Sequence, residues 1–430
     1  MRLSLPIMAT SFVSVAYNLT DTFWISGLGV SEVAGAGTAG LFLWFSEGII
    51  LLSRVGGQVF TARELGAGRV REARERAAAS LSFAILLGLL MAALLHLFRA
   101  PLISLFNLPN SETIEAASTY LGITAVGVFF AYLARQLTAL AISAGNSRAP
   151  FRINSSGLIL NMILDPLLIY YLKLGVAGAA WATVISQIAV ALLLAFTILR
   201  QEPFTNLKIF RLREQLPLWA KMFKLGLPVA IQNIGFASIS MYVARLIASF
   251  GDPAIAAQKV GAQIESITWL TAEGFAQAVT TFISQNHGNS KPDRALKGYH
   301  QGLLMISGIG IVNSLLLFFG SSLIFSIFLQ EPMALAEGSR YLKIVSLSQV
   351  FMCYEMLASA AYNGFGRSLF PSFVVISGIF MRIPLSHFLI SLGYGVASIW
   401  WAISLSSIVV GTILIIAFEL SKKKLAYEGK

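Results

Sequence analysis

Long apolar stretches recur along this chain at nearly regular intervals, separated only by short polar connections. A helix that crosses a bilayer needs about 20 mainly apolar residues, and it must satisfy its own backbone hydrogen bonds there. Hydrophobic residues make up 56% of the sequence and charged residues only 12%, which leaves no room for a soluble domain. We therefore expect an all-α membrane protein of about twelve spans, at residues 4–27, 33–60, 77–98, 117–142, 153–172, 177–199, 223–249, 254–284, 299–320, 338–362, 371–392 and 395–419.

The basic residues, which give a net charge of +11, lie mainly in alternate connections. Residues 63–76 and 291–297 are basic loops, whereas the connections of the opposite side contain little beyond Arg99 and Lys173. The positive-inside rule then places both termini in the cytoplasm and requires an even number of spans. Topology thus explains the charge, so we expect membrane lipids rather than nucleic acid as partners, and a multi-pass location in the plasma (inner) membrane.

Two halves of the sequence look like one six-helix unit used twice. The matching positions include Leu5-Pro6 with Leu227-Pro228, Gly145-x-Ser147-x-x-Pro150 with Gly366-x-Ser368-x-x-Pro371, and Pro166-Leu167 with Pro384-Leu385. The expected domains are an N-terminal bundle (1–200), a basic amphipathic cytoplasmic linker (201–222), a C-terminal bundle (223–420) and a basic cytoplasmic tail (421–430). Six helices return the chain to its starting side, so the two pseudo-symmetric bundles would enclose a central cleft that opens by rocking.

Two aspartates lie within expected spans of the first half, with no Lys or Arg beside them in the sequence. They are Asp21 and Asp165, and Asn161 stands one helical turn before Asp165 on the same face. A charge at the bilayer centre costs about 2.5–3.5 kcal/mol, so retained carboxylates are commonly functional. Oxygen ligands suit Na⁺, and a partly desolvated carboxylate suits a transported proton. In the structural alternative, Asp165 caps a helix break at Pro166 and Asp21 pairs with an arginine.

Three glutamates in the second half are candidates for lining a cavity. Glu265 and Glu273 are eight residues apart on one helix face, and Glu355 lies in a later span. Pairing of the first two with Lys259 or Arg245 is an equally good explanation of their presence.

Enzyme motifs are missing from this sequence. It contains no HExxH pair and no Walker A sequence, and a dinucleotide-like glycine pattern at residues 35–40 lies inside an apolar span without a preceding strand. We therefore predict a transporter and not an enzyme, with no cofactor and with H⁺ or Na⁺ as the transported coupling ion. Because a single chain would enclose its own cleft, we expect a monomer.

Taken together, the two halves, the early Pro6 before Asp21, and Asn161-x-x-x-Asp165-Pro166 resemble the multidrug and toxic compound extrusion (MATE) family, particularly its DinF-like and archaeal branch. The resemblance implies a cation site made of Asp21, Asn161, Asp165 and Thr183, which would be a metal site if the ion is Na⁺. It also implies a bend at Pro6, and antiport of amphiphilic or cationic organic compounds by alternating access.

Two other transporter classes have comparable halves. A lipid-linked precursor flippase of the same superfamily would need a cavity lined by cations, for which Arg135, Arg245 and Arg382 are the only hints. A major-facilitator transporter normally has an Asp-Arg signature after its second helix, which residues 63–68 lack. We rank the flippase second and the major-facilitator transporter third.

Overall fold

The computed structural model describes residues 20, 24, 25, 27–106, 108, 110–209, 211–328 and 331–427. Within these ranges the chain forms thirteen α-helices and one π-helical turn, without a β-strand. Nine helices of the described part are long and apolar enough to cross a membrane, and a bent pair of shorter helices makes a tenth candidate. The prediction of an all-α membrane protein is confirmed. Most of the first expected span, including Pro6 and Asp21, lies outside the described residues.

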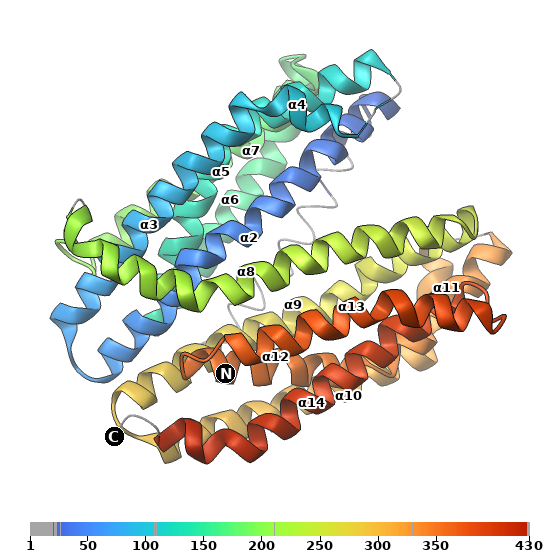
Figure 1. Ribbon diagram of the computed structural model, residues 1–430. Coiled ribbons are helices and arrows are strands. Elements are labelled where there is room, and N and C mark those ends of the chain that lie inside the picture. Colours follow the sequence, from blue (N-terminus) through green and yellow to red (C-terminus); the bar gives the residue numbers. More distant parts are fainter. Residues whose placement is uncertain are drawn as a thin grey trace. The chain divides into compact units, whose positions relative to one another are not determined.

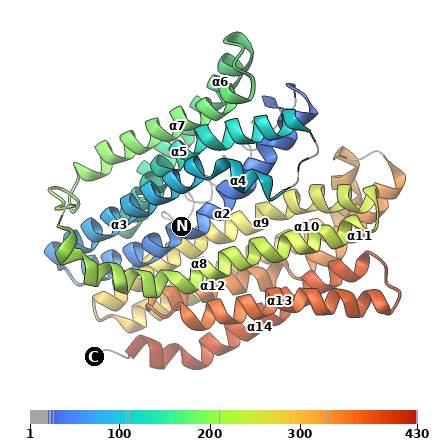
Figure 2. The ribbon, with the colours of Figure 1, turned by 45° about the horizontal axis from the view of Figure 1, so that its top comes forward.

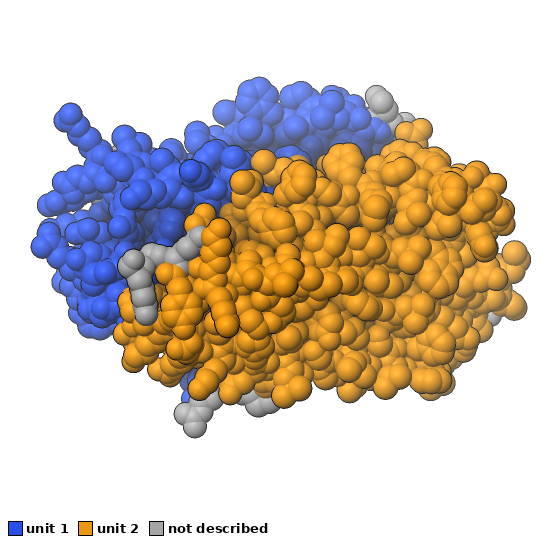
Figure 3. Space-filling view, turned by 60° about the horizontal axis from the view of Figure 1, so that its bottom comes forward, with its two compact units in different colours: residues 1–230 blue, residues 231–430 orange. Residues whose placement is uncertain are grey.

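The chain divides into two compact units, residues 1–230 and 231–430 (Figure 3). The first unit contains α2 (Val30–Gly66), α3 (Val70–Leu97), α4 (Arg99–Ser104), α5 (Ser111–Ser143), α6 (Arg148–Pro166), the π-helical turn η1 (Leu167–Tyr171), α7 (Gly175–Leu199) and the beginning of α8 (Leu212–Ala248). The second contains the rest of α8, α9 (Asp252–Gly288), α10 (Pro292–Phe328), α11 (Pro332–Ser346), α12 (Gln349–Gly364), α13 (Leu369–Ser391) and α14 (Ala397–Tyr427).

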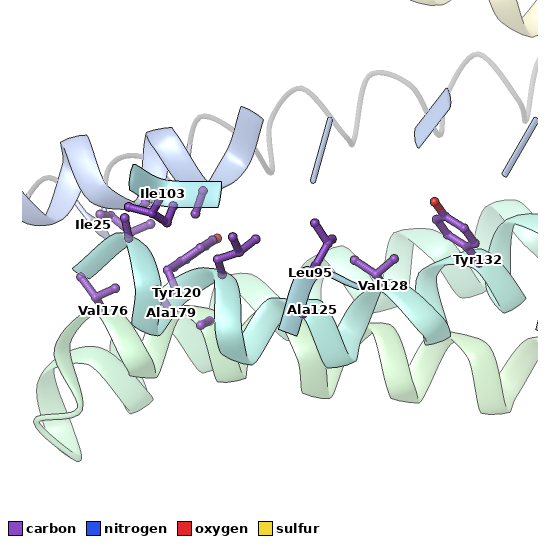
Figure 4. Packing of buried hydrophobic residues seen from close by; sticks show 14 of the residues in the cluster. Ile25, Leu95, Ile103, Tyr120, Ala125, Val128, Tyr132, Val176 and Ala179 are labelled. Atoms are coloured by element: carbon purple, nitrogen blue, oxygen red, sulfur yellow. The ribbon is translucent and has the colours of Figure 1, made fainter. Parts of the chain in front are cut away.

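Helix α5 forms the centre of the first unit, where it lies beside α2, α3 and α7 (Figures 1 and 2). Its buried Tyr120 and Val128 belong to one apolar cluster with Leu95 of α3 and Ala179 of α7 (Figure 4). Gly35 of α2 meets α5 closely, because a Cβ there would lie 2.8 Å from the backbone nitrogen of Ala117. This packing gives α7 a fixed support, and α6 in turn packs on α7.

Helix lengths in the second unit repeat those of the first. Helices α2 and α9 both have 37 residues, and they begin at residues 30 and 252. Helix α5 covers residues 111–143, and α11 with α12 covers the matching stretch from 332 to 364. Unlike α5, this stretch is interrupted at residues 347–348 and bends there by 47°. The span expected at 338–362 is therefore broken.

Part of the segment expected to be a surface linker is anchored on α3 of the first unit. Arg74 Nη2 lies 2.6 Å from Glu202 Oε2, and Phe204 is only 3% exposed. The Trp219 ring stacks on Phe83 with a centroid distance of 5.3 Å, and α8 already begins at Leu212. These apolar side chains pack against α3 itself, which holds the start of α8 in the first unit.

Candidate functional site

One face of α6 carries three buried residues at four-residue spacing. They are Gly157, Asn161 and Asp165, and the last two are 1% and 0% exposed. Residues four apart lie above one another on an α-helix, so all three point toward α7. A Cβ on Gly157 would lie 2.0 Å from Val190 Cγ2. The missing side chain lets the two helices approach closely and brings the next polar residues of α6 against α7.

The amide of Asn161 connects Asp165 to α7. When the amide is oriented to satisfy both neighbours, its oxygen accepts a hydrogen bond from the Thr183 backbone N–H at 3.1 Å. Its nitrogen then donates to Asp165 Oδ2, also at 3.1 Å. The structure thus brings together three of the four residues expected at a cation site, with a hydrogen-bond donor aimed at the carboxylate. The expected threonine contributes its backbone to this arrangement.

The helix changes its winding directly after Asp165. Helix α6 ends at Pro166, and residues 167–171 form the π-helical turn η1. Proline has no N–H to donate, so the carbonyl of Met162 lacks its usual helical donor. A Cβ on Gly178 of α7 would lie 2.7 Å from the Leu168 carbonyl oxygen, so α7 touches this turn directly. Single π-helical turns are frequent at functional sites, and this one adjoins the buried carboxylate.

Asp21 and Pro6 lie outside the described residues, so their expected roles remain predictions. The end of the first span is nevertheless near the site. The hydroxyl of Tyr170 in η1 donates to the backbone oxygen of Trp24 at 2.6 Å, and the two rings meet edge to face. Asp21 is three residues before Trp24 in the sequence.

A second polar cluster lies in the second unit. Glu265 of α9 accepts hydrogen bonds from the Tyr341 hydroxyl at 2.8 Å and from Gln349 Nε2 at 3.3 Å. Arg382 of α13 interacts electrostatically with both Glu265 and Glu355. The third expected residue, Glu273, is two helical turns from Glu265 and contacts Gln277 of its own helix at 3.3 Å.

Matching side-chain contacts show which residues of α13 in the second unit correspond to the site residues of α6 in the first. A Cβ on Gly378 of α13 would lie 2.0 Å from Val410 Cγ2 of α14, the same contact that Gly157 makes with Val190. Counting four and eight residues onward from each glycine, Arg382 takes the place of Asn161 and Ser386 that of Asp165. This equivalence was not predicted from the sequence, although the Gly145 and Gly366 motifs already contain its spacing. In this register Pro166 corresponds to His387 and not to Pro384.

One further pair of charged residues within the spans forms an ion pair. Arg135 Nη2 of α5 lies 2.6 Å from Glu47 Oε1 of α2. Next to it, the Tyr132 hydroxyl donates to the backbone oxygen of Ser46. These contacts tie α2 to α5, which supports a structural role for this pair. Among the described residues, no group of three or more His, Cys, Asp or Glu side chains could hold a metal ion.

Buried polar pairs between spanning helices, on a frame of repeated helices without enzyme motifs, are typical of a secondary transporter. The MatE family model matches residues 6–167 and 228–388, so this chain belongs to the MATE family of transporters. The predictions of the family, of a multi-pass membrane transporter and of a protein that is not an enzyme are confirmed. The DinF-like and archaeal branch remains a prediction.

Named relatives and a solved structure agree with this assignment. The chain is 25% identical to the probable multidrug resistance protein NorM of Thermotoga maritima, over 98% of this chain and 92% of the relative. It is 23% identical to the probable multidrug resistance protein YpnP of Bacillus subtilis, over 85% and 82%. A crystal structure of a MATE protein in its bent conformation matches with a TM-score of 0.90 and 21% identity, over 99% of this chain and 95% of that one. This structural match shows that the two chains share a fold.

Proposed function

We propose that this protein exports amphiphilic, cationic organic compounds in exchange for protons, by alternating access, and that Asp165 binds the coupling proton. The names of the NorM and YpnP relatives support multidrug efflux. The support for the proton comes from Asn161: with its amide oriented to satisfy both neighbours, the nitrogen donates to Asp165 Oδ2 at 3.1 Å.

Sodium would need oxygen ligands around the ion, and the part of the Asn161 amide that faces Asp165 in this orientation is a donor. The Asn161 oxygen already accepts from the Thr183 backbone at 3.1 Å. To bind Na⁺ through Asn161, the amide would have to turn and give up this bond. A proton needs no such change, because protonation removes a buried negative charge while the amide stays in place.

In the proposed cycle, protonation of Asp165 changes the contacts between α6, η1 and α7. The carboxylate is 0% exposed, so its charge is held by hydrogen bonds to neighbouring groups. Loss of the charge weakens those bonds and shifts the unit toward the state that releases substrate outside. Pro6 would supply the bend of the first span. Asp21 would complete the site.

The flippase alternative receives little support from Arg135 and Arg382, two of the three arginines that motivated it. Arg135 is paired with Glu47 at 2.6 Å, and Arg382 interacts with two carboxylates. Neither arginine therefore supplies the positively lined cavity that an anionic lipid-linked precursor would need. Efflux of organic cations remains the better proposal.

Proteoliposomes test this proposal. The purified protein is reconstituted, and transport of a fluorescent organic cation is followed under an imposed proton gradient or an imposed Na⁺ gradient. We expect the proton gradient alone to drive transport, and Asp165→Asn to abolish that drive. Glu112→Gln removes an exposed carboxylate at the start of α5 and serves as the control. Transport driven only by Na⁺ would overturn the choice of ion, and an unaffected Asp165→Asn protein would overturn the site.

We also propose the plasma membrane as the location, with both termini in the cytoplasm. The single cysteine, Cys353, is buried and gives little background reaction with reagents from outside. New cysteines at Gly68 and Asn110, which lie in consecutive connections, should react from opposite sides of the membrane. Reaction of both from the same side would contradict the predicted topology.

A further inference from the structure

The last turns of α14 lie along the first turns of α10, and three titratable side chains meet between them (Figure 1). Lys422 Nζ donates a hydrogen bond to His300 Nε2 at 3.0 Å, and it also forms an ion pair with Glu419. Glu419 Oε1 lies 3.4 Å from the same nitrogen of His300. Nearer the two helix ends, the Tyr427 hydroxyl donates to Asp293 Oδ1 at 2.8 Å. Polar contacts at two levels therefore attach the end of α14 to α10.

The hydrogen-bond partners of His300 assign its protonation state. Its Nδ1 lies 2.8 Å from the Leu296 carbonyl oxygen, which can only accept, so Nδ1 carries a hydrogen. The ammonium group of Lys422 can only donate, so Nε2 accepts through its lone pair. The ring is therefore neutral in this arrangement, and it accepts a hydrogen bond from the cation that it faces.

Glu419 offers the ring an acceptor that is not in use. Its Oε2 is paired with Lys422, whereas its Oε1 is buried and has no hydrogen-bond partner among the described residues. Because the neutral Nε2 of His300 has no hydrogen, it cannot donate to Oε1 across the 3.4 Å between them. Buried acceptors are rarely left unsatisfied. A proton on Nε2 would supply the missing donor and would at the same time place two positive charges 3.0 Å apart.

The other helices that pack on α10 bring no printed charge to this ring within the described part of the chain. Helix α9 contributes the apolar Phe282 ring, which lies against α10 two residues before His300. Helix α12 contributes Tyr362, whose hydroxyl is bonded to Ser421 at 2.9 Å, and α11 meets the opposite end of α10. On α10 itself, Lys297 is one turn away in the sequence. The two charged groups of α14 therefore decide how the ring responds to a proton.

We propose that His300 is a proton-binding site at the cytoplasmic end of the second unit, and that its protonation moves the attachment of α14 from Lys422 to Glu419. The proton comes from water, which reaches the 45% exposed imidazole. The new Nε2–H donates to Glu419 Oε1, while repulsion turns Lys422 away and frees the residues that follow it. Histidine is the side chain whose ordinary pKa lets its charge change between about pH 5 and 8.

This site would let the second unit respond to the acidity of the cytoplasm. Helix α14 also packs against α11, α12 and α13, so its attachment is set at a helix that contacts most of the unit. The inference goes beyond the proposed export activity, and it holds whichever ion drives transport.

A nitroxide spin label at position 423 tests the site. Lys423 is exposed and adjacent to Lys422, and the native Cys353 is buried, so Lys423→Cys directs the label there. Label mobility in the full-length protein is followed by electron paramagnetic resonance from about pH 8 to about pH 5. We expect the ratio of mobile to immobile label to rise about three- to five-fold in acid, as loss of one exposed charged contact would produce. His300→Gln keeps an acceptor for Lys422 but takes up no proton, so its label should stay immobile throughout.

Lys422→Met gives an independent test in which the response should have the opposite sign. Without the ammonium group nothing repels the protonated ring, and its new bond to Glu419 remains, so acid should make the label less mobile. His96→Gln, which removes a histidine of the first unit, is the matched control and should keep the wild-type response.

Three outcomes would overturn the site. They are a wild-type spectrum that does not change with pH, a response that persists in His300→Gln, and an acid-induced rise in mobility in Lys422→Met. Because the measurement uses neither substrate nor an ion gradient, such a failure would leave the proposed transport activity unaffected.

Discussion

Gly157 and Val190 meet so closely that a Cβ on the glycine would lie 2.0 Å from Val190 Cγ2. Gly157→Ala should therefore destabilise the protein by about 1–3 kcal/mol, the usual cost of overpacking, although alanine is otherwise the better helix former. Thermal unfolding in detergent measures this effect.

Two further variants test whether the contact with Val190 causes the loss of stability in Gly157→Ala. Val190→Ala removes the colliding methyl group, so the double variant should be more stable than the two single effects added together predict. Gly37→Ala is the control, because no atom lies within 4 Å of a Cβ at that position. Additive effects in the double variant would show that the contact is not the cause.

Asn161 is expected to matter through the hydrogen bond that it donates to Asp165. Asn161→Leu keeps a similar volume but removes the donor at 3.1 Å, and hydrogen bonds to charged groups contribute about 1.5–3 kcal/mol. We expect proton-driven efflux to fall by about ten-fold or more, since 1.4 kcal/mol corresponds to ten-fold. Asn154→Leu is the matched control on the same helix, because within the described part of the chain the Asn154 side chain makes a single long contact, 3.4 Å from Thr138. Equal losses in both variants would contradict the assigned role.

Glu202 should give a small pH dependence of stability. Hydrogen bonds from Thr205 and then Arg74 lower the pKa of this exposed carboxyl below its ordinary value of 4.5. A folded-state pKa below the unfolded one stabilises the fold above the unfolded pKa, and this contribution disappears as the pH falls through the folded pKa. The melting temperature of the wild type should therefore exceed that of Glu202→Gln at pH 7, and the difference should vanish in acid. A difference that grows on acidification would reverse the assigned sign.

Trp219 should anchor the segment before α8 through two separable contacts. Its ring stacks on Phe83 with 16° between the planes, and its Nε1–H donates to the Ala79 carbonyl at 2.8 Å. Trp219→Phe keeps most of the stacking and should lose about 1 kcal/mol for the hydrogen bond. Trp219→Ala loses both contacts and should be clearly less stable. Limited trypsin digestion should then cut faster at Arg200 and Lys208.

The tryptophan at position 44 provides the control for this anchor. Its side chain is 41% exposed, so Trp44→Ala should leave the digestion rate at residues 200–211 unchanged. Unchanged digestion of the Trp219→Ala protein would show that Arg74, Glu202 and Phe204 hold the segment without the tryptophan.

The amino-acid sequence was sufficient to predict the helical membrane class, the repeated halves and the face of α6 that carries Asn161 and Asp165. These features depend on local spacing, because apolar length sets a span and a four-residue interval sets a helix face. The repeat also predicted that helices of matching length recur, as α2 and α9 do.

Which groups meet across helices became clear from the three-dimensional packing. The packing places the Asn161 amide between Asp165 and the Thr183 backbone. It brings Glu265 within hydrogen-bond distance of Tyr341 and Gln349. It also places Arg382 at the position that Asn161 has in the first unit. Such contacts depend on how far one helix is shifted and rotated against another. That register is set by close packing at positions such as Gly157 and Gly378, and the spacing of residues within one helix does not contain it.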